Sequence, residues 1–305
     1  MWASFELFST KWAIFNTGIT HSSRKSPRLP LVFTLHRYMN QSNSNTKTCK
    51  TTSKGVVLIT GAGKRRLGFE TAKYLGECGY SIALHFNKSQ VEAQQSLVEL
   101  IESGITARSF QADITSQSEI EQLGTAVKSE MGSIDGLVTT ASIWEPTPIN
   151  KISDGISQQI QVNAIGTIHC CQIIGLMMSE QPSGGSIITV GDWAVEQPYE
   201  NHVGYFAAKG AVVAATRSLA VDLASLNPKI RVNCINPGPV LFPDRFDQKT
   251  RDRIQQETLL KHVDDPAAFA ETVEFFLRNK MATGQVINID SGRGLSRHSP
   301  TAREQ

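Results

Sequence analysis

The feature that most restricts the fold of this chain is a regular alternation of short apolar runs with helical patterns, beginning at Gly55. Seven runs have the length and composition of buried strands: GVVLIT, YSIALHF, ARSFQAD, DGLVTT, GSIITV, KIRVNCINP and GQVINID. Helical patterns separate them, and the longer ones lie near 116–131, 153–180, 203–226 and 266–279. Strands that alternate with helices form parallel sheets with helices on both faces. The sequence therefore predicts a single α/β domain with a doubly wound, seven-stranded parallel sheet.

We place this domain at residues 55–297, between a leader at 1–54 and a tail at 298–305. The leader contains eight Lys or Arg, one acidic residue and no sustained periodicity. Three interpretations of the leader stay open: a transit peptide, a disordered segment, or a gene model that starts too early, for which Met39 offers a later start. We expect a cytoplasmic protein, with organellar targeting by the basic leader as the alternative.

Composition excludes several classes of function. The formal net charge is +2 over 305 residues, so nothing indicates binding to nucleic acid. No run of about 18 apolar residues occurs, so we expect no membrane span. The five Cys form no CxxC pair and the seven His form no HExxH motif. We therefore expect no metal site, and buried free thiols in a reducing compartment.

A glycine-rich turn follows the first strand and opens the first helix, at Thr60–Gly68. Such a turn in a Rossmann-type sheet lets the backbone approach a pyrophosphate, and the helix N-terminus favours anions. The alternative is a merely tight strand–helix turn. The candidate cofactor-binding residues of the turn are Gly61, Gly63, Lys64, Arg65, Arg66, Leu67 and Gly68.

The end of the second strand indicates which nucleotide is used. NAD enzymes usually carry an acidic residue there for the ribose 2′-hydroxyl, but this strand ends with Asn87, Lys88 and Ser89. Cations and hydroxyl donors suit a 2′-phosphate, so we predict NADPH. The alternative is a solvated loop surface. After the third strand, Asp113 and Ile114 are candidates for the adenine pocket, although Asp113 could equally cap the next helix.

These motifs occur in the order typical of one family. They are the turn at Thr60–Gly68, TTAS at 139–142, Asn163, Tyr205-x-x-x-Lys209, and Pro237-Gly238. Over about residues 55–295 the chain resembles the short-chain dehydrogenase/reductase family. The resemblance implies cofactor contacts for Thr140, Ala141, Lys209, Pro237 and Gly238. It also implies catalytic roles for Asn163, Tyr205 and Lys209, and a homotetramer built on the helices near 153–180 and 203–226.

A narrower resemblance is to pteridine reductases and dihydromonapterin-type reductases. TTASIWEPTPI at 139–149, GAGKRRLG in the first turn and NPGPVLFP at 236–243 are similar to segments of those enzymes. Asp192 stands where most family members carry a Ser before the Tyr, as it does in pteridine reductases. Three features depart from the pattern: the first turn is one residue longer, Thr139 and Thr140 replace asparagines, and the last strand ends in DSGRG.

The expected chemistry is hydride transfer coupled to proton transfer. Tyr205 and Lys209 lie four residues apart, on one face of a helix. The Lys209 ammonium is expected to lower the phenol pKa of Tyr205 and to hold the nicotinamide ribose, and Tyr205 then delivers the proton. Asn163 is expected to anchor a water that resupplies protons; the alternative is a buried amide that satisfies a helix backbone.

Asp192 and Trp144 are the candidates that set the substrate. A carboxylic acid with a raised pKa can protonate a ring nitrogen during reduction of a C=N bond; the alternative is a solvated loop Asp. Trp144 is expected to stack on a pterin, and its alternative role is a hydrophobic anchor of the loop. We therefore predict an NADPH-dependent pterin reductase. A carbonyl or alcohol reductase and a non-catalytic NADPH-binding protein are the alternatives.

Overall fold

The computed structural model of the chain describes residues 53–151 and 155–296. The predicted tail and all but the last two residues of the predicted leader therefore lie outside the described residues. The described residues form one domain around a parallel sheet, in the spatial order β3-β2-β1-β4-β5-β6-β7. Its strands are β1 (Val56–Thr60), β2 (Ser81–Phe86), β3 (Ala107–Gln111), β4 (Gly136–Thr139), β5 (Gly185–Val190), β6 (Ile230–Pro237) and β7 (Val286–Ile289). All seven predicted strands are confirmed, and so is the doubly wound fold.

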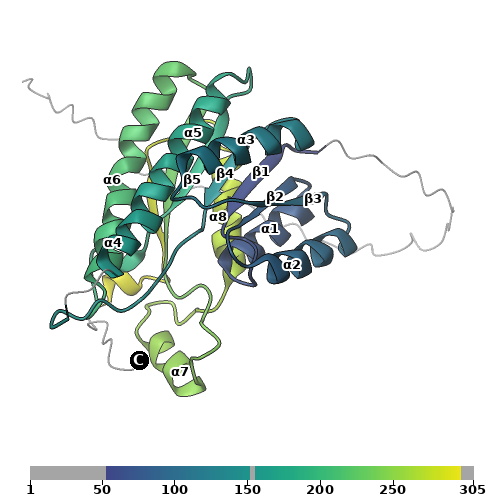
Figure 1. Cartoon of the computed structure of the whole chain (residues 1–305). Coiled ribbons are helices and arrows are strands. Elements are labelled where there is room, and N and C mark those ends of the chain that lie inside the picture. Colours follow the sequence, from purple (N-terminus) through teal and green to yellow (C-terminus); the bar gives the residue numbers. More distant parts are fainter. Residues whose placement is uncertain (1–52, 152–154, 297–305) are drawn as a thin grey trace, which may run out of the picture. The chain divides into compact units, whose positions relative to one another are not determined.

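Helices cover both faces of this sheet (Figure 1). They are α1 (Leu67–Glu77), α2 (Gln90–Glu102), α3 (Gln117–Met131), α4 (Gly155–Gln159), α5 (Thr167–Ser179), α6 (Val203–Leu226), α7 (Gln248–Gln256) and α8 (Pro266–Arg278). A π-helical segment, η1 (Ile160–Gly166), joins α4 to α5, and η2 (Trp193–Val195) and η3 (Arg293–Leu295) are single 3₁₀ turns. The sequence did not predict α7, because its residues QKTRDRIQQ bury only Thr250 and Ile254 and show no apolar stripe.

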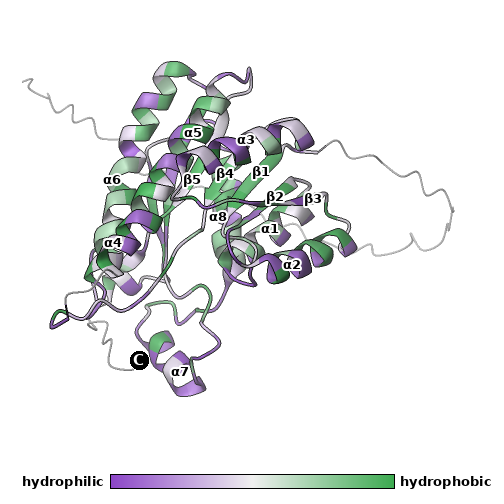
Figure 2. Cartoon of the chain, viewed as in Figure 1, coloured by the Kyte–Doolittle hydropathy of each residue, from purple (hydrophilic) through white to green (hydrophobic). Residues whose placement is uncertain are grey.

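The core has two halves, one on each side of the sheet. Successive strand side chains point to opposite faces, so Leu58 packs with α3, α5 and α6, whereas Ile59 packs with α1, α2 and α8. Both side chains are fully buried, as is most of the sheet. Figure 2 shows the central strands as the most hydrophobic part of the domain, with polar residues on the outer helix faces. A strand buried on both sides needs a continuous apolar run, which is the pattern that the sequence displays.

One helical stretch, Gly155–Ser179, has the length and mean hydropathy (1.3) of a membrane span. Half of its most apolar window is buried inside the domain, where α5 packs against α3 and α6. The core helix of a globular domain meets the same criteria, so this stretch is weak grounds for a membrane span.

The strand order places the candidate site. From β1 in the middle, the chain runs outward to β3, returns to β4 beside β1, and then runs outward again to β7. In such sheets the crevice for a ligand lies beyond the carboxyl ends of the strands, where the direction of winding changes. The loops after β1, β4, β5 and β6 all meet at that edge.

Candidate active site

Asp192 and Tyr205 are in direct contact at this edge. Asp192 follows β5 and begins the turn η2, where its Oδ1 accepts a hydrogen bond from the Ala194 N–H at 2.8 Å. Its Oδ2 accepts the Tyr205 hydroxyl, also at 2.8 Å. Burial raises the pKa of Asp192 despite these two bonds. The carboxyl group is therefore fixed at both oxygens and holds a proton more readily than an ordinary Asp.

Lys209 lies one helical turn after Tyr205 on α6, as their spacing predicted, and its side chain is buried. Its Nζ donates to the Val190 carbonyl at 2.8 Å and lies 5.7 Å from the centroid of the Tyr205 ring. The expectation that Lys209 lowers the pKa of Tyr205 was wrong for this structure. Burial raises the pKa of Tyr205 well above its usual value, and the Asp192 carboxylate raises it further. Tyr205 is thus a proton donor here, not a ready phenolate.

Asn163 lies in the π-helical segment η1 and is buried. Its side-chain oxygen accepts the Ile143 N–H at 2.8 Å, and its amide nitrogen donates to the Ile143 carbonyl at 2.7 Å. The amide therefore satisfies the backbone of the loop after β4, and not that of a helix. The role of Asn163 in proton resupply stays a prediction; its side chain visibly positions the loop that carries Trp144.

Trp144 belongs to a group of aromatic side chains beside Tyr205, which we call the aromatic wall: Trp144, Tyr199, His202 and Phe206. The Trp144 Nε1 donates to the Tyr199 hydroxyl at 2.8 Å, and its ring stacks on His202 with centroids 5.2 Å apart. The guanidinium of Arg245 lies 4.9 Å from the Trp144 ring. Trp144 is thus an anchor of its loop, and stacking on a substrate stays a prediction.

The glycine-rich turn is held by close packing against neighbouring strands. Gly61 has φ of +71°, and a Cβ there would lie 2.6 Å from the Ala141 Cα. A Cβ on Gly63 would lie 2.7 Å from the Phe86 Cβ, and one on Gly68 would overlap the Thr140 hydroxyl. These glycines are required by the fold itself, and they bring the backbone of Thr140 and Ala141 against the turn.

His85, at the end of β2, is a buried residue that the sequence analysis missed. Its Nδ1 accepts the Gly61 N–H at 3.1 Å, and its Nε2 lies 3.0 Å from the Ala112 carbonyl oxygen. Burial lowers the pKa of His85 to about 4, so the ring is neutral at pH 7. One imidazole therefore joins the glycine-rich turn to the loop after β3. The only sequence signal was a lone polar residue inside the apolar run SIALHF.

The predicted phosphate-binding cations differ in what they contact. Lys64 pairs with Glu92 at 3.4 Å, and Arg65 pairs with Glu99. Among the described residues, Arg66 and Lys88 form no ion pair, and both are exposed, although the charge of Lys88 helps to lower the pKa of Asp113. Ser89 begins α2, yet its hydroxyl caps no backbone N–H. Lys88, Ser89 and Arg66 are therefore the groups free to receive a phosphate.

Asp113 does not cap the next helix, which was one of its two predicted roles. Its Oδ1 accepts the N–H and the hydroxyl of Thr115, at 2.9 and 2.7 Å, and these bonds lower its pKa. Ser116 caps α3 instead, by accepting from the Glu119 N–H. The side chain of Asn87 bonds Asp113 and so ties β2 to this loop. Ile114 is 5% exposed and packs in the core, so only its backbone is free to contact a cofactor.

The remaining predicted residues lie at the same edge. Leu67 opens α1 and packs against the core, Pro237 ends β6, and the Gly238 N–H donates to the Ile289 carbonyl at 2.8 Å. A Cβ on Gly238 would lie 2.5 Å from the Asp290 Cα. No group of three or more possible metal ligands occurs within residues 53–151 and 155–296.

Arg293, in η3, is a second residue that the sequence analysis missed. Its guanidinium lies 4.7 Å from the Trp193 ring, next to Asp192, and it pairs with Glu257, which also binds Arg253 at 3.0 Å. The positive charge of Arg293 lowers the pKa of Asp192, in opposition to burial. The segment after β7 therefore packs against the turn η2, which Asp192 begins.

Comparison with known proteins agrees with this geometry. The family model described as enoyl-(acyl carrier protein) reductase matches residues 61–293. A 3-oxoacyl-(acyl-carrier-protein) reductase of Staphylococcus epidermidis is 28% identical over 240 residues, covering 77% of this chain and 97% of the relative. A dihydromonapterin reductase of an Enterobacter species is 26% identical over 246 residues, covering 79% of this chain and 97% of the relative.

Other relatives and the solved structures are consistent with these matches. Carbonyl reductase family member 4 of Xenopus laevis is 28% identical over 234 residues, covering 76% of this chain and 95% of the relative. A short-chain type dehydrogenase/reductase from Mycobacterium ulcerans has the same fold, with a TM-score of 0.74 at 24% identity over 80% of this chain and 91% of that one. The matched family model spans most of the chain, so this protein belongs to the short-chain dehydrogenase/reductase family of oxidoreductases, whose members use nicotinamide cofactors.

Proposed function

We propose that this protein is an NADPH-dependent reductase of a pterin ring. The observation that carries the proposal is the hydrogen bond from Tyr205 to Asp192, at 2.8 Å, where most family members place a Ser. Bound NADPH would supply the hydride to a ring carbon, and the adjacent ring nitrogen would then need a proton. Asp192 can hold that proton because burial raises its pKa, and Tyr205 can relay it from the neighbouring position. The relatives include a dihydromonapterin reductase.

The first alternative is a carbonyl reductase. Relatives named as 3-oxoacyl and carbonyl reductases favour it, and Tyr205 could donate to a carbonyl oxygen as readily as to a nitrogen. An ionised Asp192 would repel a carbonyl oxygen, whereas a protonated Asp192 would donate to it, so Asp192 alone does not separate the two functions. A purely non-catalytic role is disfavoured, since Tyr205 and Lys209 are both buried at the site and hydrogen-bonded.

The choice of NADPH rests on the end of β2. Lys88 and Arg66 form no ion pair in the described part of the chain, and the Ser89 hydroxyl caps no backbone N–H at the N-terminus of α2. A guanidinium, an ammonium and a hydroxyl beside a helix N-terminus suit a doubly charged phosphate. A ribose 2′-hydroxyl would instead call for an acidic side chain at this point, and none is present at residues 87–89.

A turnover panel tests the proposed function directly. The purified protein is assayed with NADPH against dihydrobiopterin, dihydromonapterin and dihydrofolate, and against simple ketones and a 3-oxoacyl thioester. We expect kcat/KM for at least one dihydropterin to exceed that for every ketone by at least about tenfold. Faster reduction of a ketone would replace the proposal with the carbonyl reductase. NADPH binding without turnover of any compound would leave the non-catalytic alternative.

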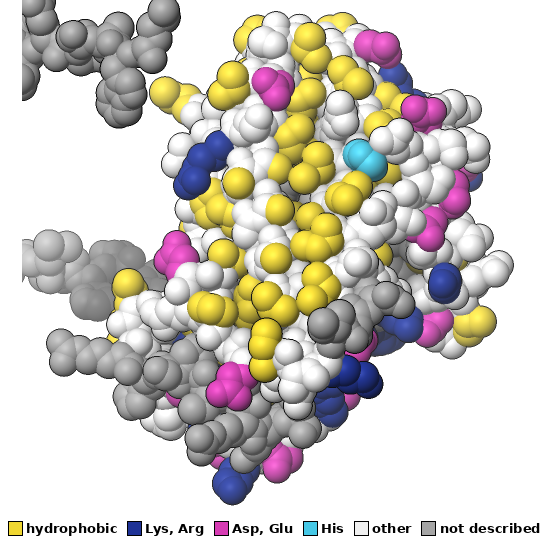
Figure 3. Space-filling model, turned by 60° about the vertical axis from the view of Figure 1, so that its left-hand side comes forward, with side chains coloured by type: hydrophobic (Ala, Val, Ile, Leu, Met, Phe, Trp, Pro, Cys, Tyr) yellow, Lys and Arg dark blue, Asp and Glu magenta, His cyan; other side chains and the backbone are white. Residues whose placement is uncertain are grey.

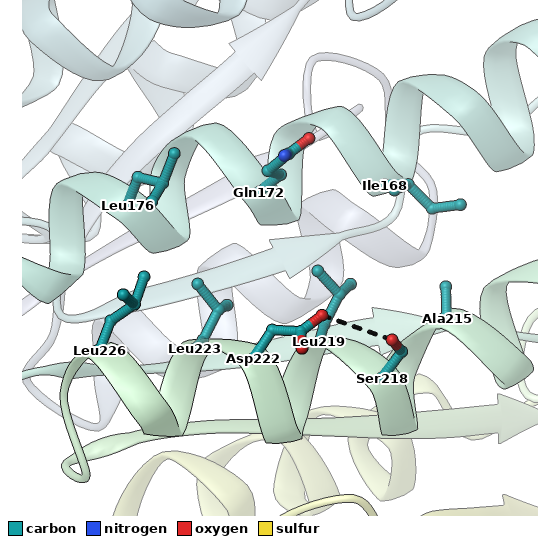
Figure 4. A pocket seen from close by; sticks show the side chains of 9 residues that line it. All are labelled: Ile168, Gln172, Leu176, Ala215, Ser218, Leu219, Asp222, Leu223 and Leu226. Atoms are coloured by element: carbon teal, nitrogen blue, oxygen red, sulfur yellow. Dashed lines mark hydrogen bonds between the residues drawn. The ribbon is translucent and has the colours of Figure 1, made fainter.

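We also propose that the protein forms a homo-oligomer through α5 and α6. Hydrophobic side chains gather in a band on this face of the molecule (Figure 3). Leu176 and Leu226 are about half exposed, and Val221 is 71% exposed. Between the two helices runs a groove of about 470 Å³ (Figure 4), lined by Ile168, Gln172, Leu176, Ala215, Ser218, Leu219, Asp222, Leu223 and Leu226.

The proposed occupant of this face is the same face of a second copy. Asp222 is the one charged residue that lines the groove, and Ser218 on the same helix donates to it at 3.4 Å. The groove lining contains no basic residue, so the groove offers nothing to an anionic lipid or a nucleic acid. An identical apolar face is complementary to it under a two-fold axis, which is the commonest symmetry of oligomers.

A further inference from the structure

Arg245 has an unusual environment among the arginines of the C-terminal half. Five arginines follow β6 in the described chain: Arg245, Arg251, Arg253, Arg278 and Arg293. Four of them pair with a carboxylate on Asp264, Glu257 or Glu274. Arg245 forms no ion pair with any described residue, and its side chain is exposed. Its guanidinium instead lies over the Trp144 ring at 4.9 Å and near the Phe246 ring at 6.0 Å.

The backbone that carries Arg245 is well fixed. The Phe246 N–H donates to the Pro243 carbonyl at 3.0 Å, and the Phe246 carbonyl accepts from Arg251 Nε at 3.1 Å. The next residue, Asp247, caps α7 by accepting the Thr250 N–H at 2.8 Å. The position of the Arg245 Cα is thus set by its neighbours, and its cation is held beside an aromatic ring, whose face attracts positive charge.

This cation lies at the edge of the proposed substrate site. The Trp144 Nε1 donates to the Tyr199 hydroxyl at 2.8 Å. The Tyr199 and Phe206 ring centroids lie 4.8 Å apart, and the Phe206 and Tyr205 centroids 5.4 Å apart. Arg245 is therefore at the outer end of the aromatic wall, and the Asp192–Tyr205 pair is at its inner end. Burial lowers the pKa of His202, which stacks on Trp144, and the charge of Arg245 lowers it further. The wall thus presents neutral rings and one unpaired cation.

We propose that Arg245 binds an anionic group of the substrate, a carboxylate or a phosphate, on the part of the molecule farthest from the reacting ring. The proposal rests on the proposed function for the identity of the reacting ring. The negative charge of the group that binds Arg245 is argued separately, from the residues around Arg245. A guanidinium accommodates two oxygens of a carboxylate or phosphate at once, and its place beside Trp144 reduces the freedom lost on binding. Arg245 is then a specificity residue: it affects KM for acidic substrates and leaves the proton chemistry of Asp192 and Tyr205 alone.

The test compares acidic and neutral substrates of the same skeleton. The pairs are dihydroneopterin phosphate against dihydroneopterin for a phosphate, and dihydrofolate against its diethyl ester for a carboxylate. Arg245→Gln removes the charge, and Arg245→Lys keeps it without the planar pair of donors. The matched control is Arg108→Gln, because Arg108 is also exposed but pairs with Glu130 at the β3 edge of the sheet.

We expect Arg245→Gln to raise KM for the acidic member of one pair at least about tenfold, which corresponds to about 1.4 kcal/mol. KM for the neutral member and kcat for both members should stay within about threefold of the parent's values. KM of Arg245→Lys for the acidic member should lie between those of the parent and Arg245→Gln. If KM changes for the phosphate of the first pair, Arg245 binds a phosphate; if it changes for the acid of the second pair, Arg245 binds a carboxylate. Equal changes for acidic and neutral substrates, or no change for either, would overturn the proposal.

The same design separates this proposal from the proposed function. If the parent protein reduces no pterin, the pterin proposal fails, and 8-oxononanoate, whose carboxylate lies far from its ketone, is then compared with its ethyl ester in the same variants. A selective loss for the oxo acid in Arg245→Gln supports the anion-binding role without any pterin chemistry. An equal effect on the acid and its ester contradicts that role.

Discussion

The Tyr205 hydroxyl donates to the Asp192 carboxylate at 2.8 Å, and this bond joins the first turns of α6 to the end of β5. Burial raises the pKa of both groups, and the charge of Asp192 adds to the rise at Tyr205. A pair of this kind retains its shared proton to higher pH than either group would alone in water. It is therefore suited to protonate a substrate during reduction.

Replacement of Asp192 should separate pterin reduction from cofactor binding. Asp192→Ser should reduce dihydropterin turnover by at least about 100-fold, the usual scale for a positioned acid. Asp192→Asn keeps the shape and the acceptor for the Ala194 N–H, but it turns an amide donor toward the Tyr205 hydroxyl, and we expect a similar loss. The dissociation constant of NADPH should stay within about twofold. Dihydropterin turnover at the parent rate in both variants would show that Asp192 has no part in the reaction.

Lys88 should determine the preference for NADPH over NADH. Lys88→Ala removes one charge-assisted contact, which is worth about 1.5–3 kcal/mol, so KM for NADPH should rise at least tenfold. KM for NADH should be nearly unchanged. Lys64→Ala is the matched control, because Lys64 is paired with Glu92 and we expect a smaller effect. An equal loss with both coenzymes in Lys88→Ala would mean that Lys88 does not contact the 2′-phosphate.

His85 should make the domain less stable in weak acid. Its pKa is about 4 in the folded protein and about 6.5 in a free peptide, so the unfolded chain binds the extra proton first. Its contribution is complete above about pH 6.5 and is lost as the pH falls toward 4, by about 3 kcal/mol in total. Urea unfolding of the parent and of His85→Gln at pH 7 and pH 4.5 measures this loss.

The free energy of unfolding of His85→Gln should depend less on pH than that of the parent. The Gln side chain can accept from the Gly61 N–H and donate to the Ala112 carbonyl, but it does not titrate. His169→Gln is the control, since that ring is partly exposed on α5. If the parent and His85→Gln lose the same free energy between the two pH values, His85 is not the group responsible.

A charge on the face formed by α5 and α6 should prevent association. Val221→Glu should give a smaller particle by light scattering, because a carboxylate would be buried against the same face of the second copy. Val91→Glu is the control, because Val91 on α2 is 69% exposed and Val221 on α6 is 71% exposed. The Val91 variant should keep the mass of the parent. If the Val221 variant also keeps it, the oligomer uses another surface.

The sequence alone determined the fold and most of the candidate site. Buried parallel strands need continuous apolar runs, and residues directly after such strands gather at one edge, so the sequence placed Asp192 at that edge. The resemblance to the short-chain dehydrogenase/reductase family then grouped Asp192 with Tyr205 and Lys209. The glycine-rich turn could also be predicted from the sequence. In the structure, a left-handed φ at Gly61 and a close approach to Ala141 both exclude a side chain there. Helix α7 was missed, since a helix that buries two residues leaves no periodic signal.

Tertiary structure decided which of these groups touch and which are free. His85 and Arg293 act through contacts with Gly61, Trp193 and Glu257, residues distant from them in the chain. The pKa of Tyr205 rises because Tyr205 is buried beside the Asp192 carboxylate, while the Lys209 ammonium donates to the Val190 carbonyl. Likewise, Lys64 and Lys88 look equivalent in sequence until Glu92 is found beside one of them. Burial and pairing are properties of the assembled domain, because both depend on segments that only the folded chain brings together.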